Sequence, residues 1–251
     1  QVLQRTLKEK LKILILIPAR LESVRLNKKP LRLINGIPMI IRVANRAKLL
    51  KLGKVIVATD NRDICSLLKK ASINFYLTTE KHNSGTDRIY EVYKNLPMKK
   101  VDVILNLQGD LPYFSANIIT SIIDLMYDKM TDIGTAVCDL QKEEISDLNI
   151  VKARVNLEKN ETGFAKDFKR EIKNLRNYYH HIGIYAYRPE ILEKFVSLEQ
   201  TKSEKDRKLE QLRALNNKMK IKIVKVNEIP PSIYTPEDLK KIRLFFRENN
   251  V

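Results

Sequence analysis

Residues 13–30 read ILILIPARLESVRLNKKP. The first five are apolar without polar alternation, which is typical of a strand buried on both faces. The residues that follow form a polar loop, and its cations are Arg20, Arg25, Lys28 and Lys29. A buried strand that ends in a charged loop predicts an α/β protein, because function in such folds collects beyond the carboxyl ends of the strands.

The rest of the first half repeats this alternation. Apolar runs predict further strands at 54–58, 73–77 and 101–107, and helical periodicity predicts helices at 38–52 and 86–93, with another from a Ser115 cap to Met126. Asp60 is placed to cap the helix after the second strand. Strands that alternate with helices indicate a parallel sheet flanked by helices.

The second half is less regular. We expect strands at 131–140, 148–157, 180–187 and 219–226, helices at 189–197 and 205–216, and a last helix that begins at a Thr235 cap. Segment 151–176 carries many charges and predicts a lobe or loop of its own. The expected organisation is one α/β domain over 1–251, with a mixed, mainly parallel sheet and a smaller β-rich lobe at about 131–190.

Composition narrows the function. The chain has 251 residues, 43% of them hydrophobic, and a net charge of +17, so an acidic partner such as a nucleotide, an anionic sugar or nucleic acid is expected. No two of the seven glycines lie closer than 17 residues, which excludes the usual dinucleotide and P-loop fingerprints. Two cysteines without metal-ligand spacing and the lack of a long apolar segment predict a soluble, cytoplasmic protein without a zinc site.

Three loops after predicted strands carry groups suited to a nucleotide. The cations after the first strand can hold phosphates, Ser84-Gly-Thr86 opens a helix whose N-terminus favours anions, and Asp110 in QGD can hold Mg²⁺. Each loop also has a plainer interpretation: a solvated basic loop, ordinary helix caps and a β-turn aspartate. Their expected position at one edge of the sheet favours the nucleotide site.

From about Lys12 to the C-terminal helix, the sequence resembles the 3-deoxy-manno-octulosonate (Kdo) cytidylyltransferases. The residues that carry the resemblance are IPARLESVRLNKKPL (17–31), INGIPMI (34–40), VIVATD (55–60), SGTDR (84–88), LNLQGDLP (105–112), HIGIYAYR (181–188), LEQLR (209–213) and TPEDL (235–239). The resemblance implies a nucleotide-diphospho-sugar transferase-like fold, a homodimer and use of Mg²⁺. The implied reaction joins CTP and Kdo into CMP-Kdo and pyrophosphate, for lipopolysaccharide biosynthesis.

The resemblance also assigns residues. Arg25, Lys29 and Asp110 are expected to be catalytic, with Asp110 as the metal ligand. The nucleotide side is expected to comprise Pro18, Ala19, Arg20, Arg25, Lys29, Ser84, Gly85, Thr86, Arg88, Gln108 and Asp110. Because Kdo carries a carboxylate and many hydroxyls, its pocket needs a cation and neutral hydrogen-bonding groups. The candidates are Arg170, His181, Tyr185, Glu210 and Gln211. The first three lie in the lobe at about 131–190, which is also expected to mediate dimerisation.

The sequence departs from the family pattern at one important position. Tyr234 stands where the family has an aspartate that shares the metal, and a neutral phenol is a poor Mg²⁺ ligand. A relative that binds CTP or sugar with weak turnover is therefore one alternative, and an enzyme for another sugar acid, such as sialic acid, is a second. A nucleic-acid-binding protein is a third, although the lysines are spread along the whole chain without an aromatic RNA-binding motif. Nucleic acid is therefore not an expected partner, and neither is membrane insertion.

Overall fold

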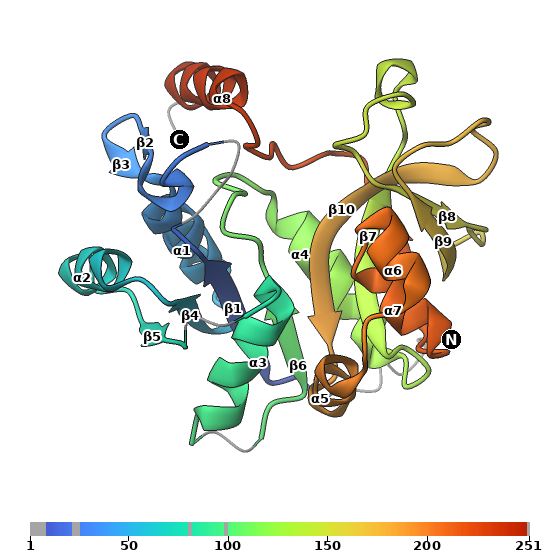
Figure 1. Cartoon of the computed structure of the whole chain (residues 1–251), viewed down its shortest axis with the longest axis horizontal. Coiled ribbons are helices and arrows are strands. Elements are labelled where there is room, and N and C mark those ends of the chain that lie inside the picture. The colour runs from blue at the N-terminus through green and yellow to red at the C-terminus, as the bar shows by residue number, and fades with distance from the viewer. Residues whose placement is uncertain (1–8, 22–25, 80–81, 98–99, 250–251) are drawn as a thin grey trace, which may run out of the picture.

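The structure is a computed structural model that describes residues 9–21, 26–79, 82–97 and 100–249. Within these residues, the centre of the protein is a nine-stranded sheet of order β5-β4-β1-β6-β10-β7-β11-β9-β8 (Figure 1). Its strands are β1 (Ile13–Ala19), β4 (Gly53–Thr59), β5 (Phe75–Leu77), β6 (Val103–Asn106), β7 (Ile133–Cys138), β8 (Lys152–Val155), β9 (Thr162–Lys169), β10 (Tyr178–Tyr187) and β11 (Ile221–Lys225).

The two halves of the sheet differ in direction. Strands β5, β4, β1 and β6 are parallel, as the alternating pattern predicts. Strand β10 runs antiparallel to β6, β7 and β8, and β9 runs antiparallel to β11 and β8. Strands β7 and β11 pair in parallel, but antiparallel pairs predominate in this half, so the expectation of a mainly parallel sheet is right for the first half only. Strands β7 to β11, most of them from the expected lobe, extend the same sheet, and the β8–β10 pairing curls this end round on itself.

Helices cover both faces of the sheet. On one face, Ile13, Ile15 and Ile17 of β1 share a core with four helices. These are α1 (Met39–Leu49), α2 (Arg62–Lys70), α4 (Ala116–Asp124) and α8 (Pro236–Glu248). On the other face, Leu14 and Leu16 pack with α3 (Gly85–Asn95), α5 (Pro189–Ser197) and α7 (Gln211–Asn216). The strand at 13–17 is thus buried on both faces, as its unbroken apolar run predicts.

Helix caps follow the sequence in three cases and differ in one. Ser84, Ser115 and Thr235 each accept a hydrogen bond from a backbone N–H in the first turn of their helices. The prediction that Asp60 caps α2 is wrong, because the helix begins at Arg62 and Asn61 accepts the capping hydrogen bond. Asp60 instead forms an ion pair with Arg88 of α3, 2.6 Å away.

The helix expected at 205–216 is two helices, α6 (Lys202–Arg207) and α7. Lys208 between them adopts the left-handed conformation, with φ 53°, which ends α6 and reverses the chain. The buried pair Arg213–Glu204, 2.6 Å apart, then holds the two helices together. Sequence patterning also misses β9 and the hairpin β2 (Leu33–Ile34) and β3 (Ile37–Pro38), because neither shows regular alternation.

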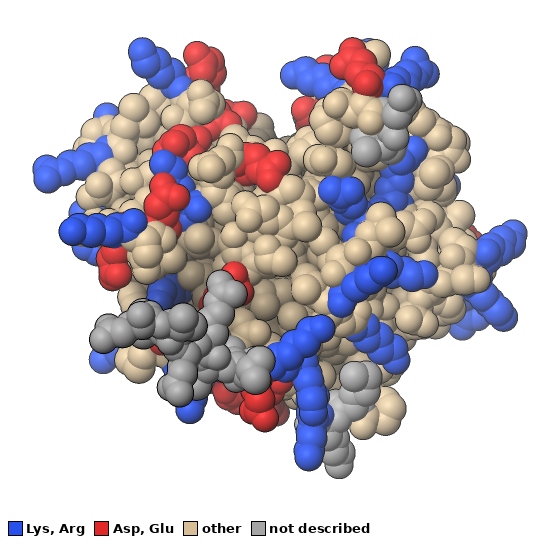
Figure 2. All heavy atoms as spheres, turned by 180° about the vertical axis from the view of Figure 1, so that it is seen from behind, with Lys and Arg blue, Asp and Glu red and all other residues tan. Residues whose placement is uncertain are grey.

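The surface is basic but not uniformly so. Figure 2 shows one face on which Lys and Arg side chains lie round the rim and across the lower right, with Asp and Glu side chains scattered among them. Within the part of the chain that the structure describes, none of the helices combines the length and apolar character needed to cross a bilayer.

Candidate nucleotide and sugar site

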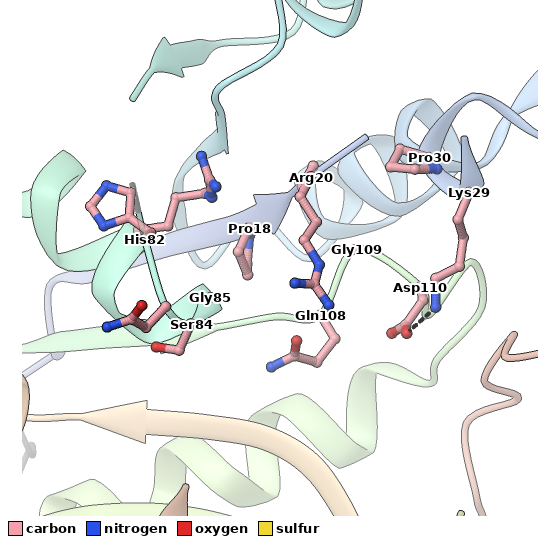
Figure 3. Close-up of a pocket in the computed structure, with 13 residues that line it drawn as sticks. Pro18, Arg20, Lys29, Pro30, His82, Ser84, Gly85, Gln108, Gly109 and Asp110 are labelled. Atoms are coloured by element: carbon pink, nitrogen blue, oxygen red, sulfur yellow. Dashed lines mark hydrogen bonds and ion pairs between the residues drawn. The ribbon is translucent and has the colours of Figure 1, made fainter. Parts of the chain in front are cut away.

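A pocket of about 280 Å³ opens beyond the carboxyl ends of β1 and β6, beside the N-terminus of α3 (Figure 3). It brings together all three loops singled out in the sequence. Its lining residues are Pro18, Ala19, Arg20, Lys29, Pro30, His82, Asn83, Ser84, Gly85, Arg88, Gln108, Gly109 and Asp110. Of the predicted nucleotide residues, Thr86 lies outside the lining, and Arg25 lies outside the described residues. His82 and Asn83 join the pocket without having been assigned from the sequence.

Glycine is required where two of these loops meet. A Cβ atom on Gly109 would lie 2.8 Å from the carbonyl oxygen of Pro18, and that backbone atom cannot move aside as a side chain could. The close approach brings the QGD turn against the end of β1. It thereby places Asp110 and Lys29 at one end of the pocket, as Figure 3 shows.

At that end, Lys29 and Asp110 form an ion pair. The ammonium of Lys29 lies 2.6 Å from Oδ2 of Asp110 and donates a second hydrogen bond, 2.7 Å long, to the carbonyl oxygen of Ile233. It also lies 5.5 Å from the ring centroid of Tyr234, within the range of a cation–π contact. The side chains of Lys29 and Asp110 are 18% and 22% exposed, so a ligand in the pocket can reach both.

At the opposite end, the N-terminus of α3 faces the pocket. Ser84 is the cap residue and Gly85 is the first residue of the helix, so free backbone N–H groups and the positive end of the helix dipole lie beside both. This arrangement suits an anion. Arg88, one turn further on, is buried, and its guanidinium donates hydrogen bonds to Asp60 and to Thr78. Arg88 therefore anchors α3 to the ends of β4 and β5, in addition to lining the pocket.

His82 ties the loop before α3 to the helix itself. Its Nε2 contacts the carboxylate of Glu91, which also accepts hydrogen bonds from the backbone N–H and the hydroxyl of Thr79. His82 and Glu91 are nine residues apart in the sequence, and they meet because α3, which begins at Gly85, places Glu91 beside the loop that carries His82.

The rings of the two predicted sugar residues on β10, His181 and Tyr185, contact each other at a tilt. The rings of His181 and Tyr185 are 5.4 Å apart between centroids, and Phe168 packs on the other side of His181 at 5.1 Å. Burial lowers the pKa of His181 to about 3, so its ring is neutral at physiological pH.

The hydrogen bonds of Thr135 fix the tautomer of this ring. The Thr135 hydroxyl has carbonyl acceptors at Ile182 and Ile184, 3.0 and 2.8 Å away, and lies 3.1 Å from Nε2 of His181. Because its single proton goes to a carbonyl, the hydroxyl accepts from His181, and Nε2 carries the proton. Nδ1 is then left as an acceptor.

Glu210 directly precedes α7 and Gln211 is its first residue. Oε2 of Glu210 accepts a 2.8 Å hydrogen bond from Thr86, and Oε1 lies 3.9 Å from Nη2 of Arg213. Among the described residues, neither this buried Oε1 nor the buried Nε2 of Gln211 has a hydrogen-bond partner. Burial is the main cause that raises the pKa of Glu210, against hydrogen bonds from Ser84 and Thr86 that lower it.

Asn106 is a third residue of this kind, and sequence reasoning did not assign it. It lies opposite Tyr185 in the β6–β10 ladder and is 2% exposed, and its Oδ1 has no hydrogen-bond partner among the described residues. A buried polar atom left unpaired costs about 1–3 kcal/mol, so such a group needs a reason in function or a bound water. An amide inside the apolar run VDVILNL was the available signal.

Arg170 lies near this cluster but is engaged with the backbone. Its guanidinium donates to the carbonyl oxygens of Leu148 and Lys208, at 2.8 and 3.4 Å. The second contact places it beside the turn that leads to Glu210. The fully buried Lys152 donates to the carbonyl oxygen of Arg170, 2.7 Å away, and holds the segment in place.

Among the described residues, Asp110 is the one carboxylate that lines the pocket, and no group of three or more of their His, Cys, Asp or Glu side chains forms a ready metal site. This donor set still fits Mg²⁺, which commonly takes one or two carboxylates and completes its shell with water and substrate phosphates. The residues that would hold it are Asp110 and, through its carbonyl oxygen, Ile233.

Comparisons with known proteins identify the family. The cytidylyltransferase family model matches residues 14–221. The 3-deoxy-manno-octulosonate cytidylyltransferase of Bartonella bacilliformis is 42% identical over 237 residues, covering 93% of this chain and 98% of that protein. The chain belongs to the 3-deoxy-manno-octulosonate cytidylyltransferase family. The enzyme of the same name from Rickettsia prowazekii is 39% identical over 241 residues, with 95% and 96% coverage.

Solved structures agree with this family. A CMP:2-keto-3-deoxy-manno-octonic acid synthetase in complex with CTP superposes with a TM-score of 0.86 and 32% identity, covering 95% of this chain and 99% of that one. The 4-diphosphocytidyl-2C-methyl-D-erythritol synthase of Anaerococcus prevotii, at 13% identity and a TM-score of 0.64, shares the fold, with 96% and 98% coverage. The protein is thus a nucleotidyltransferase with a mixed α/β fold, as the motifs predict.

Proposed function

We propose that the protein transfers the cytidylyl group of CTP to Kdo, giving CMP-Kdo and pyrophosphate for lipopolysaccharide synthesis. The observation that carries the proposal is the hydrogen bond from Thr86 to Glu210, because it joins the helix at the nucleotide pocket to the cluster of unpaired polar groups. The relatives named above, together with the neighbour solved with CTP, support the choice of both substrates.

In the proposed mechanism, the anomeric hydroxyl oxygen of Kdo attacks the α-phosphorus of CTP in line. The new O–P bond forms as the bond to the β-phosphate oxygen breaks; pyrophosphate leaves with the electron pair, and the hydroxyl proton is lost to water. Arg20, Lys29 and the N-terminus of α3 hold and neutralise the phosphates, so catalysis consists mainly of positioning and charge stabilisation. Mg²⁺ held on Asp110 supplies further charge neutralisation at the phosphates when bound.

The sugar side is assigned to the β10 cluster and the start of α7. Nδ1 of His181 and the unpaired atoms of Asn106, Glu210 and Gln211 offer acceptors and one donor to the hydroxyls of Kdo. Arg170 is the cation proposed for the Kdo carboxylate, and to reach it the guanidinium must exchange a carbonyl contact for the ligand. Segment 131–190 thereby contributes Arg170 and His181 to the sugar site, which Asn106 of β6 and the start of α7 complete.

Two further properties follow from the family resemblance. We infer that the enzyme works as a homodimer in the cytoplasm, with part of segment 131–190 in the dimer interface. Light scattering coupled to size-exclusion chromatography tests the dimer, since a monomeric mass at micromolar concentration would contradict it.

The function is tested by ³¹P NMR on a mixture of protein, CTP, Kdo and Mg²⁺. We expect the CTP resonances to be replaced by those of pyrophosphate and of a single phosphodiester. The same experiment with sialic acid in place of Kdo tests whether the protein activates another sugar acid. A faster reaction with sialic acid than with Kdo would reassign the substrate. A second candidate, a binding protein with weak turnover, is favoured by Tyr234, and substoichiometric product despite tight CTP binding would establish it.

A further inference from the structure

The ammonium of Lys29 lies between two oxygen atoms of the kinds that bind hard metal ions, a carboxylate and a backbone carbonyl. They are Oδ2 of Asp110 and the carbonyl oxygen of Ile233, at 2.6 and 2.7 Å. The two oxygens come from chain segments 123 residues apart, and a backbone hydrogen bond of 3.3 Å from the Ile233 N–H to the Asp110 carbonyl oxygen keeps the segments together. Convergent carboxylate and carbonyl oxygens are ligands that hard divalent cations prefer.

An ammonium and a divalent cation cannot occupy this position together. Both need direct contact with the same carboxylate oxygen, and two positive charges at that separation repel each other strongly. The Lys29 side chain is part-exposed, stands on the short 3-10 helix Lys29–Leu31 and lines the pocket proposed for the triphosphate. A triphosphate offers the ammonium a more negative partner than Asp110 does.

We propose that Lys29 exchanges with the divalent cation on Asp110: in the nucleotide-free protein its ammonium blocks the cation position, and the phosphates of CTP draw it away and open that position. The part that concerns the phosphates rests on the proposed function. The exchange makes metal binding depend on nucleotide, so the protein alone is a poor metal binder. In this exchange, the backbone carbonyl of Ile233 becomes the second protein ligand of the cation. It lies next to Tyr234, the position at which the family has a carboxylate.

The exchange is tested by Mn²⁺ binding to the nucleotide-free protein, with the EPR signal of free Mn²⁺ as the readout. We expect Lys29→Met to bind Mn²⁺ at least tenfold more tightly than the wild type, because the blocking charge is gone. Lys28→Met is the matched control, since this exposed neighbour carries the same charge away from Asp110, and it should leave Mn²⁺ affinity within about twofold. The double variant Lys29→Met with Asp110→Asn should lose the gain.

Equal Mn²⁺ affinity of Lys29→Met and the wild type would overturn the proposal, and so would a gain that survives Asp110→Asn. Lys29→Gln, which keeps a donor for the Ile233 carbonyl, serves as a second variant and should show the same gain. Calorimetry with CTP in the presence of a chelator is read separately. If the wild type binds no CTP, the proposed function fails, whereas the Mn²⁺ result still decides whether Lys29 blocks Asp110.

Discussion

The hydroxyl of Thr86 donates a 2.8 Å hydrogen bond to Oε2 of Glu210, across 124 residues of chain. Thr86 belongs to the first turn of α3, beside the end of the pocket that we assign to an anion, and Glu210 directly precedes α7. The bond thus connects the part of the protein that is assigned to CTP with the part that is assigned to the sugar. The other carboxylate oxygen of Glu210, Oε1, is buried and accepts no hydrogen bond from the described residues.

Replacement of Glu210 by Gln should raise the KM for Kdo by about tenfold, the cost of weakening a charged hydrogen bond, while CTP affinity changes little. The same variant should be more stable than the wild type at pH 7. Because burial raises the pKa of Glu210, the charged form of this side chain is disfavoured in the folded protein. The neutral carboxyl therefore adds to the free energy of unfolding at low pH, and this contribution is lost as pH rises through the raised pKa.

Urea unfolding of both proteins at pH 7 and at pH 4.5 measures this difference. The stability gain of Glu210→Gln should shrink at the lower pH, where the wild-type carboxyl takes up its proton. The exposed Glu199→Gln is the matched control and should show no such pH dependence. A variant that is less stable than the wild type at pH 7 would show that the charge of Glu210 supports the fold.

Replacement of Lys29 by Ala should weaken the binding of CTP about 10- to 100-fold and that of CMP less than threefold, because only CTP carries the outer phosphates that we assign to the ammonium. Calorimetry with both nucleotides checks the difference, with Lys28→Ala as the control. Equal losses for CTP and CMP would place Lys29 away from the outer phosphates.

His181 should make the protein acid-sensitive. Burial lowers its folded pKa to about 3, well below the roughly 6.5 of an unfolded histidine, so the unfolded chain takes up the proton first as pH falls. The neutral ring contributes fully to the free energy of unfolding above about pH 6.5. Below that pH, the free energy of unfolding falls by up to roughly 1.4 kcal/mol per pH unit. Unfolding experiments between pH 7 and pH 4 should show this slope.

The variant His181→Gln should remove the slope and raise the KM for Kdo without affecting CTP. His180→Gln is the matched control: His180 contacts Glu144, and its charge is only the secondary cause of the lowered pKa of His181 after burial, so most of the slope should persist in this variant. If the acid sensitivity persists in His181→Gln, another group carries it.

Substitution of Tyr234 by Asp should lower the Mg²⁺ concentration for half-maximal turnover by about tenfold and raise turnover, because a second carboxylate then faces the metal position beside Asp110. Titration of activity against Mg²⁺ measures the effect. Tyr234→Asn, which has the shape of the aspartate variant without its charge, should show neither the higher turnover nor the lower Mg²⁺ requirement. If wild type already turns over briskly at low Mg²⁺ and the Asp variant gains nothing, the second carboxylate is dispensable.

The sequence predicts the site better than it predicts the contacts inside it. Residues 13–17 form an unbroken apolar run, and a run of this kind predicts a strand that is buried on both faces. The loops that follow such parallel strands meet at one edge of the sheet. Nine of the predicted nucleotide residues line one pocket for this reason. Local chemistry also sufficed for the caps Ser84, Ser115 and Thr235, which depend on neighbouring residues only.

The contacts that were missed depend on distant parts of the chain. Asp60 has the chemistry of a cap, and its partner Arg88, 28 residues away, is set by how α3 packs. The break at Lys208 is set by the buried Arg213–Glu204 pair, which no helical periodicity encodes. The unpaired Oδ1 of Asn106 is recognisable only once Tyr185 lies opposite it.

The central claim is tested most directly by pyrophosphate release from CTP, Kdo and Mg²⁺, with each component omitted in turn and with ATP, GTP and UTP in place of CTP. The account predicts release that requires all three components, is fastest with CTP, and falls at least a hundredfold in Asp110→Asn, or about 2.7 kcal/mol of transition-state stabilisation. Release that is independent of Kdo, or undiminished in Asp110→Asn, would contradict it.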